Sequence, residues 1–190
     1  KERVSQGIQF LYNNTDSKEF VETSANITSD LMKAIFENHS LAIDISALKT
    51  SDEYTFKHSV DVATLAMIIA KRLDMSPREV GIAGLLHDMG KAQIPNEILN
   101  KPGRLTDDEF QVMKSHSRLG YNILKKRNEF PPMIPLAVLQ HHEKMNGTGY
   151  PLKCKADKIV PFAKILSVAD VYDALVTERP YKKAFSQRTA

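Results

Sequence analysis

The chain has 190 residues, which is enough for one domain with a proper core or for a core domain with a small helical appendage. Its 26 lysines and arginines against 23 aspartates and glutamates leave a net charge of +3, too small to indicate nucleic acid or an anionic membrane as a partner. The lone Cys154 excludes an internal disulfide and fits a reducing compartment, and the sequence shows neither a signal peptide nor an apolar run of membrane-spanning length. Because the chain begins at Lys1 without a methionine, we expect a piece of a longer cytoplasmic protein.

Residues 1–50 predict a helical lead-in that carries no recognisable chemistry. After a polar break at residues 13–17, mostly apolar side chains recur at helical spacing over residues 20–35, which indicates a packing helix. A shorter apolar group leads to Thr50-Ser51-Asp52, whose side chains suit the N-cap of the next helix. We interpret His39 as incidental.

Two strong helices follow, and each carries a histidine. Over residues 52–73 the apolar positions form one stripe that includes His58, which places this histidine on a buried face. Ser76-Pro77-Arg78-Glu79 combines a capping box with proline at the first helical position, so we expect the next helix to run through His87-Asp88 and to stop near Gly90. Taken singly, one satisfying hydrogen bond explains a core histidine, and helix capping explains a His-Asp pair.

The second half of the chain predicts three more helices. Thr106-Asp107-Asp108-Glu109 indicates a capping box that opens a short helix, and His116 follows it. A helix of residues 132–142 ends in His141-His142-Glu143, before a glycine-rich functional loop at residues 144–158.

The last predicted helix, residues 163–176, is apolar except for Asp170 and Asp173, which lie three residues apart on one face. Buried carboxylates are rare unless they are paired or bound to metal. No strand pattern of useful length occurs, so we predict an all-α fold.

Five of the six histidines thus lie at the ends or inner faces of separate apolar helices, and two carboxylates join them. Imidazole and carboxylate suit first-row metals such as iron, manganese, zinc or nickel, and seven ligands exceed what one ion takes. Two ions that share Asp88 as a bridge would use all seven, and such a pair suits the hydrolysis of a phosphodiester. The five histidines are His58, His87, His116, His141 and His142; Asp88 is the shared carboxylate, and Asp170 and Asp173 are the acids on the last predicted helix.

At this point the sequence resembles the HD-GYP domains, a branch of the HD metal-dependent phosphohydrolases. The resemblance spans residues 52–183 in the family's order and leaves residues 1–50 outside, so we predict a lead-in at 1–50 and the catalytic domain at 51–190. It implies an all-α helical HD-domain bundle with additional N-terminal helices and a functional Gly-Tyr-Pro loop. The residues that carry it are 52–55 with His58, His87-Asp88-Met89-Gly90-Lys91, His116 with Gly120, His141-His142-Glu143, Asn146-Gly147-Thr148-Gly149-Tyr150-Pro151, and 170–175 followed by Arg179-Pro180-Tyr181-Lys182.

The resemblance implies seven metal ligands with Asp88 as the bridge, which agrees with the count reached above: His58, His87, Asp88, His116, His141, His142 and Asp170. It places Lys91 beside the scissile phosphate as an electrostatic stabiliser or proton donor, where the alternative is a solvated lysine. Arg179 and Lys182 would clamp a ligand phosphate. Asp173 would orient a ligand or handle a proton, where the alternative is an acid on the helix surface.

The substrate-binding set implied by the resemblance also includes Thr55, Gly147, Gly149 and Tyr150. The two glycines would let backbone amides approach the ligand, and Tyr150 would support a guanine or pack on the neighbouring helix. Glu143 would support a ligand histidine through its free ring nitrogen, and a surface salt bridge is the alternative.

Three departures from the family pattern qualify the resemblance. Asn146 stands where aspartate is common, which keeps the turn but loses a charge. Residues 152–157 lack the glycines usual after this element and are more basic. Family members with three metals supply a glutamate one helical turn before the first histidine, whereas this chain has Tyr54 there and Glu53 faces elsewhere. We therefore predict two divalent ions, iron or manganese.

The function implied is hydrolysis of cyclic di-GMP to pGpG or GMP by the output domain of a bacterial signalling protein. An upstream sensor or receiver domain is an expected partner, and a GGDEF-type domain and a second copy of the chain are further candidates. Missing N-terminal segments could tether the protein to the membrane, although this piece should not contact it. Two alternatives stay open: hydrolysis of another cyclic dinucleotide or a nucleotide phosphate, and a silent module that binds a dinucleotide or a protein.

Overall fold

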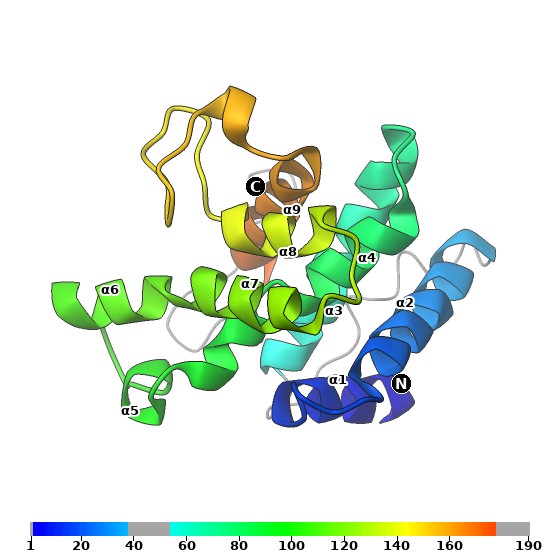
Figure 1. Cartoon of the computed structure of the whole chain (residues 1–190), viewed down its shortest axis with the longest axis horizontal. Coiled ribbons are helices and arrows are strands. Elements are labelled where there is room, and N and C mark those ends of the chain that lie inside the picture. The colour runs from blue at the N-terminus through cyan, green and yellow to red at the C-terminus, as the bar shows by residue number, and fades with distance from the viewer. Residues whose placement is uncertain (1, 38–53, 178–190) are drawn as a thin grey trace.

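The computed structural model describes residues 2–37 and 54–177, and this part of the chain is all-α, without a strand (Figure 1). The prediction of fold class is confirmed. The elements are α1 (Glu2–Asn13), α2 (Phe20–Glu37), α3 (Tyr54–Arg72), α4 (Pro77–Leu86), the 3-10 helix η2 (Met89–Gln93), α5 (Asn96–Leu99), α6 (Asp107–Lys114), α7 (His116–Arg127), α8 (Met133–Gln140), the 3-10 helix η3 (Ala156–Lys158) and α9 (Pro161–Val176).

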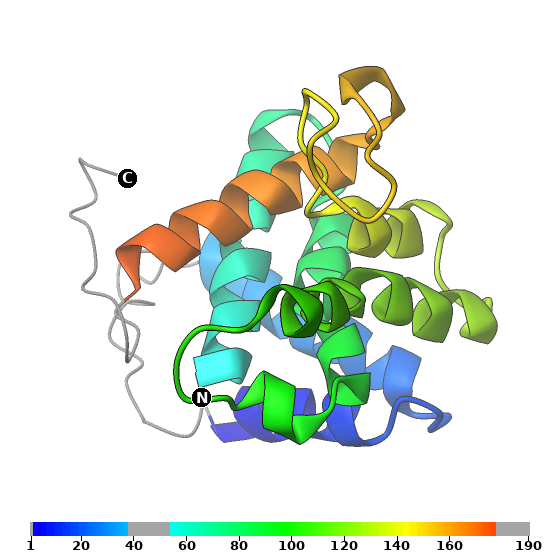
Figure 2. The same ribbon diagram turned by 90° about the vertical axis from the view of Figure 1, so that its left-hand side faces the viewer.

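The centre of the molecule is a bundle in which α3 packs against α4 and α9, while α8 packs against α4, α7 and α9 (Figures 1 and 2). These helices bury aliphatic side chains against one another, among them Val62, Leu85, Val138 and Leu166, all fully buried. Burial of such a side chain stabilises the fold by about 1.5–3 kcal/mol. The same packing brings helix ends that are distant in sequence to one place.

The predicted helix caps form. The Ser76 hydroxyl accepts a hydrogen bond from the Glu79 amide at the start of α4, and Thr106 and Glu109 form the reciprocal capping box of α6. The predicted N-cap at Thr50-Ser51-Asp52 lies outside the described residues.

The prediction that the fourth helix continues to about Gly90 is wrong, because α4 ends at Leu86. Asp88 leaves the helical conformation (φ −95°, ψ 6°), and the chain then tightens into η2. Gly90 permits the close packing at this turn: a Cβ at this residue would lie 1.8 Å from the carbonyl oxygen of His116. The turn therefore lets η2 approach the first turn of α7 and places His87 and Asp88 at the junction.

The lead-in helices are packed onto the bundle. Ile8 and Leu11 of α1 and Phe20 of α2 are fully buried in the same apolar core as α3 and α4. Between these helices, the carbonyl oxygens of Thr15 and Ser17 both accept hydrogen bonds, 2.7 Å long, from the Arg127 guanidinium at the end of α7. The division of the chain at residue 50 into two domains stays a prediction.

Among the described residues, no helix is both long enough and apolar enough to cross a membrane.

Candidate metal centre

Five helices contribute side chains to one buried cluster. His58 comes from α3, and the pair His87-Asp88 comes from the end of α4. His116 opens α7, His141 and His142 follow the last turn of α8, and Asp170 lies on α9. All but His142 and Asp170 are less than 9 % exposed. The structure therefore brings together all seven side chains that the sequence singled out as candidate ligands.

Asp88 lies at the centre of the cluster, and its two oxygens face different histidines. Oδ2 lies 3.4 Å from Nε2 of His87 and 3.8 Å from Nε2 of His58, whereas Oδ1 lies 3.3 Å from Nε2 of His116. Six of the seven side chains offer ligand atoms in two groups that share Asp88, each with its atoms within 4.8 Å of one another. One group also holds His58 and His87, the other also holds His116, His141 and His142, and Asp170 falls in neither. This geometry suits a carboxylate that bridges two cations.

Three of the imidazoles are oriented by their own helix ends. Nδ1 of His87, His116 and His141 each lies 2.7 Å from the backbone carbonyl oxygen three residues earlier. A carbonyl oxygen only accepts hydrogen bonds, so each Nδ1 carries the proton and each Nε2 presents a lone pair. A metal-binding histidine is held in this way by a partner on its other ring nitrogen.

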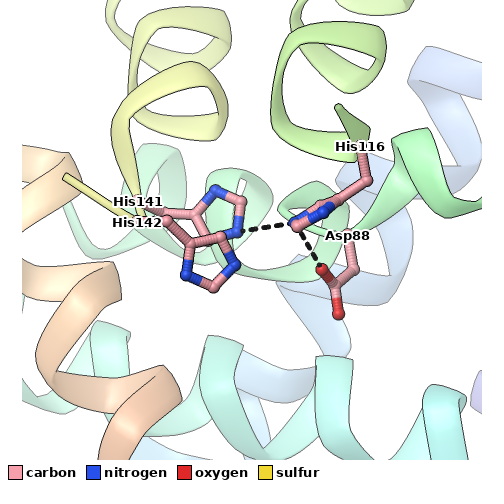
Figure 3. A group of neighbouring side chains, drawn as sticks. All are labelled: Asp88, His116, His141 and His142. Carbon is pink, nitrogen blue, oxygen red and sulfur yellow. Dashed lines mark hydrogen bonds and ion pairs between the residues drawn. The ribbon is translucent and has the colours of Figure 1, made fainter. Parts of the chain in front are cut away.

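The resulting lone pairs face one another across the cluster. Nε2 of His116 and Nε2 of His141 are only 3.3 Å apart (dashed line in Figure 3), although neither of these neutral rings has a proton to place between them. Nε2 of His87 is buried and has no hydrogen-bond partner among the described residues. Converging lone pairs and an unpaired buried nitrogen are costly without a cation, so the donor set fits divalent metal ions.

The surroundings favour neutral imidazoles in one of the two groups. Burial is the main cause that lowers the pKa of His116, His141 and His142, the last to about 4. His58 differs, because burial lowers its pKa but the hydrogen bonds to Asp170 and Asp173 outweigh this and raise it to about 9.

The carboxylates stay ionised although they are buried. Burial alone would raise the pKa of Asp88, but the charge of Lys91 holds it well below its ordinary value. Burial acts in the same direction on Asp170, and the hydrogen bond with His58 outweighs it, so that the pKa is lowered. Two anionic groups in a buried site supply the charge that divalent cations require.

Asp173 is 3 % exposed and holds His58 rather than facing solvent, so the alternative of a surface acid is wrong. Its Oδ2 lies 2.7 Å from Nδ1 of His58, and its Oδ1 accepts a hydrogen bond from the Thr177 hydroxyl. Nε2 of His58 is consequently directed toward Asp88 and lies 3.2 Å from Asp170. Asp173 is thus placed to orient a ligand histidine, one of the two roles predicted for it.

Lys91 lies beside the bridging carboxylate. Its ammonium is 2.5 Å from Oδ2 of Asp88, and its side chain keeps 28 % of its surface exposed. It is therefore paired and only partly exposed, and its predicted place beside a phosphate stays a prediction.

The loop after α8 folds over one edge of the cluster. The Tyr150 ring stacks on the His142 ring, with centroids 4.7 Å apart and planes at 28°. Gly149 is needed for this fold, because a Cβ there would lie 2.4 Å from the backbone nitrogen of Lys144. Asn146 accepts hydrogen bonds from the amide and hydroxyl of Thr148, so asparagine keeps the turn as predicted. Gly147 has a left-handed φ of 80° within the same loop. Substrate contacts of Gly147, Gly149 and Tyr150 remain predictions.

The role predicted for Glu143 is wrong. It is 4 % exposed, and its carboxylate accepts hydrogen bonds from three backbone amides of the loop, those of Leu152, Lys153 and Cys154. It organises the loop instead of supporting a ligand histidine or forming a surface salt bridge. Its position next to two histidines suggested the first role, and only the folded loop shows the second.

Arg179, Lys182 and the side chain of Thr55 lie outside the described part of the chain. Lys114, which the sequence did not single out, lies near the site with its ammonium 4.6 Å from the Phe110 ring centroid and 5.7 Å from that of Tyr150. A lysine at the end of a charged surface helix gives no distinguishing signal in the sequence.

The family model described as HD domain matches residues 41–190, which is most of the chain. A cyclic di-GMP phosphodiesterase of Pseudomonas aeruginosa is 34 % identical over 99 % of this chain and 47 % of its own length. A 3'3'-cGAMP-specific phosphodiesterase of Vibrio cholerae is 40 % identical over 69 % of this chain and 29 % of its own length. The chain belongs to the HD domain family.

A solved structure of an HDG"Y"P protein from Bdellovibrio bacteriovorus has the same fold, with a TM-score of 0.76 and 23 % identity over 90 % of this chain and 58 % of that one. Together with the curated relatives, it supports the HD-GYP branch that the motifs indicate. The chain spans less than half the length of each of the two curated relatives named above.

Proposed function

We propose that this chain is a metal-dependent phosphodiesterase domain that hydrolyses cyclic di-GMP to pGpG or GMP. The observation that carries the proposal is the division of the buried cluster into two groups of ligand atoms that share Asp88. The cyclic di-GMP phosphodiesterase that is 34 % identical supports the choice of substrate. The proposal includes iron or manganese as the metal, a sensor or receiver domain upstream, and a bacterial cytoplasmic location.

In the proposed reaction, water attacks one phosphorus of the substrate and the bond from phosphorus to the 3' oxygen breaks. Two divalent ions, held by the seven candidate ligands, would supply Lewis-acid activation of water and charge neutralisation at the phosphate. Lys91 would place its ammonium beside the phosphate and stabilise the charge that develops, or donate a proton to the leaving oxygen. Asp173 would keep the His58 ring in the orientation that directs Nε2 into the site.

A second candidate is hydrolysis of another cyclic dinucleotide. The Vibrio cholerae relative specific for 3'3'-cGAMP favours it, because its identity to this chain is 40 %. In either reaction the described cluster would act on the phosphodiester, and by itself it does not distinguish guanine from adenine.

Hydrolysis by protein loaded anaerobically with ferrous iron or manganese tests the proposal, with cyclic di-GMP, 3'3'-cGAMP and cyclic di-AMP as parallel substrates. We expect turnover of cyclic di-GMP by the wild type and a loss of at least about a thousandfold in Asp88→Ala, since removal of the bridge disrupts both ion sites. A faster reaction with cGAMP would favour the second candidate. A wild type that binds about two metals and the dinucleotide without turnover would instead show a silent binding module.

A further inference from the structure

Helix α1 contacts two elements of the candidate metal centre, although it lies before the residues that the HD domain model matches. It packs against α3, which carries His58, and against η2, which carries Lys91. Both views of the molecule show α1 beneath the first turns of α3 (Figures 1 and 2). A segment outside the matched domain therefore packs against two elements that carry residues of the site.

Tyr12 is a side chain of α1 that contacts α3 directly. Its hydroxyl oxygen lies 3.4 Å from the hydroxyl oxygen of Ser59, a fully buried residue that directly follows His58. Leu11, the neighbour of Tyr12, is itself fully buried and anchors this end of α1 in the core. The contact between the two hydroxyls thus joins elements that are 47 residues apart in the sequence.

The electrostatic surroundings of Tyr12 agree with this placement. Burial is the main cause that raises the pKa of its hydroxyl, and the negative charge of Asp88 raises it further. Charges in buried surroundings are screened much less than exposed ones. The hydroxyl therefore lies within the field of the carboxylate that joins the two groups of ligands.

We propose that Tyr12 is a positioning residue for the metal centre, acting through Ser59 on the segment of α3 that carries His58. This inference rests on the metal centre of the proposed function. The hydroxyl of Tyr12 restrains Ser59, and the backbone shared by Ser59 and His58 transmits that restraint to the ring that faces Asp88. A displacement of α1 would change the position of His58 without any change in the ligands themselves.

Packing of the aromatic ring is the simpler role for this residue, since Tyr12 also contacts the apolar core. The two roles belong to different atoms. Packing depends on the ring, which Tyr12→Phe keeps, whereas positioning depends on the hydroxyl, which Tyr12→Phe removes.

The test is a double-mutant cycle on manganese affinity, measured by competition with a chelator, in the absence of substrate. The variants are Tyr12→Phe, Ser59→Ala and their combination. Tyr121→Phe is the matched control, because it removes a hydroxyl from a partly buried tyrosine on α7 whose ring faces Lys125. We expect Tyr12→Phe to weaken manganese binding about threefold to tenfold. The double variant should bind manganese as tightly as whichever single variant binds it less tightly. In turnover assays kcat should fall while KM stays near that of the wild type.

Manganese affinity equal to that of the wild type in Tyr12→Phe would overturn the proposal. Effects of Tyr12→Phe and Ser59→Ala that simply add would also overturn it, as would an equal loss in Tyr121→Phe. Ser59→Ala removes the other hydroxyl of the same contact, the one on α3, so the test does not depend on one variant remaining folded. Because manganese binding is measured without substrate, a wild type that hydrolyses no cyclic di-GMP would contradict the proposed function and leave this test intact.

Discussion

Substitution of Asp173 by asparagine should weaken the metal centre although Asp173 is not expected to be a ligand. The carboxylate is 3 % exposed and lies 2.7 Å from Nδ1 of His58. Asparagine keeps the size of the side chain and an acceptor oxygen, but it loses the charge that makes this hydrogen bond strong. A charge-assisted hydrogen bond contributes about 1.5–3 kcal/mol, and its neutral counterpart about 0.5–1.5 kcal/mol.

The difference, about 1–1.5 kcal/mol, predicts a loss of about fivefold to thirteenfold in metal affinity for Asp173→Asn, close to the lower end of the range known for partners of metal-binding histidines. Chelator competition with manganese measures it, and kcat for cyclic di-GMP gives a second readout. Asp157→Asn is the matched control, because Asp157 is an acid of the same size with 71 % of its side chain exposed. Unchanged metal affinity in Asp173→Asn would refute the reasoning that this carboxylate orients His58.

Three further perturbations test other parts of the structure. Glu143→Gln should loosen the loop, because a side chain that accepts three backbone hydrogen bonds loses its charge. Hydrogen exchange at the amides of residues 152–154 should become about tenfold faster or more. Unchanged exchange would contradict the role of the carboxylate. Arg127→Ala should lower the free energy of unfolding by about 2 kcal/mol in denaturant titrations, since the guanidinium donates to two carbonyls and lies 4.9 Å from the Phe20 ring centroid. Lys126→Ala, at a side chain 79 % exposed, should change it by less than about 0.5 kcal/mol. Metal-free protein should be most stable near neutral pH. Histidines with a lowered pKa contribute stability above their unfolded pKa of about 6.5, and this stability is lost as the pH falls. His58 contributes stability below that value, and its contribution is lost as the pH rises through about 9. Thermal unfolding in the presence of a chelator measures this pH dependence. A Tm that stays constant both below and above neutral pH would contradict the directions of these pKa shifts.

The fold class and the assembly of the seven side chains could be predicted because their signals are local. Capping residues such as Ser76 and Thr106 mark helix starts through hydrogen bonds to amides three residues later. Histidines at the ends of apolar helices indicate one shared site, since the apolar faces must pack together. The early end of α4 was not predictable in this way, because it depends on the contact between Gly90 and α7.

The partners of buried polar groups were harder to predict. Glu143 binds amides nine to eleven residues away, in a loop whose path no periodic pattern describes. The contact between Tyr12 and Ser59 joins two helices that are separated by an undescribed stretch of chain. Such contacts depend on how helices cross, and the periodicity of a sequence shows only which faces are buried.

The anchoring of the histidines divides the centre into two kinds of ligand. His87, His116 and His141 are each oriented by a carbonyl oxygen three residues back in the chain, so their rings keep their direction as long as the backbone around them keeps its shape. His58 is oriented by Asp173 across the boundary between α3 and α9. A small shift between these two helices would therefore turn the His58 ring and leave the other three rings unchanged, which makes His58 more sensitive to this motion than His87, His116 and His141.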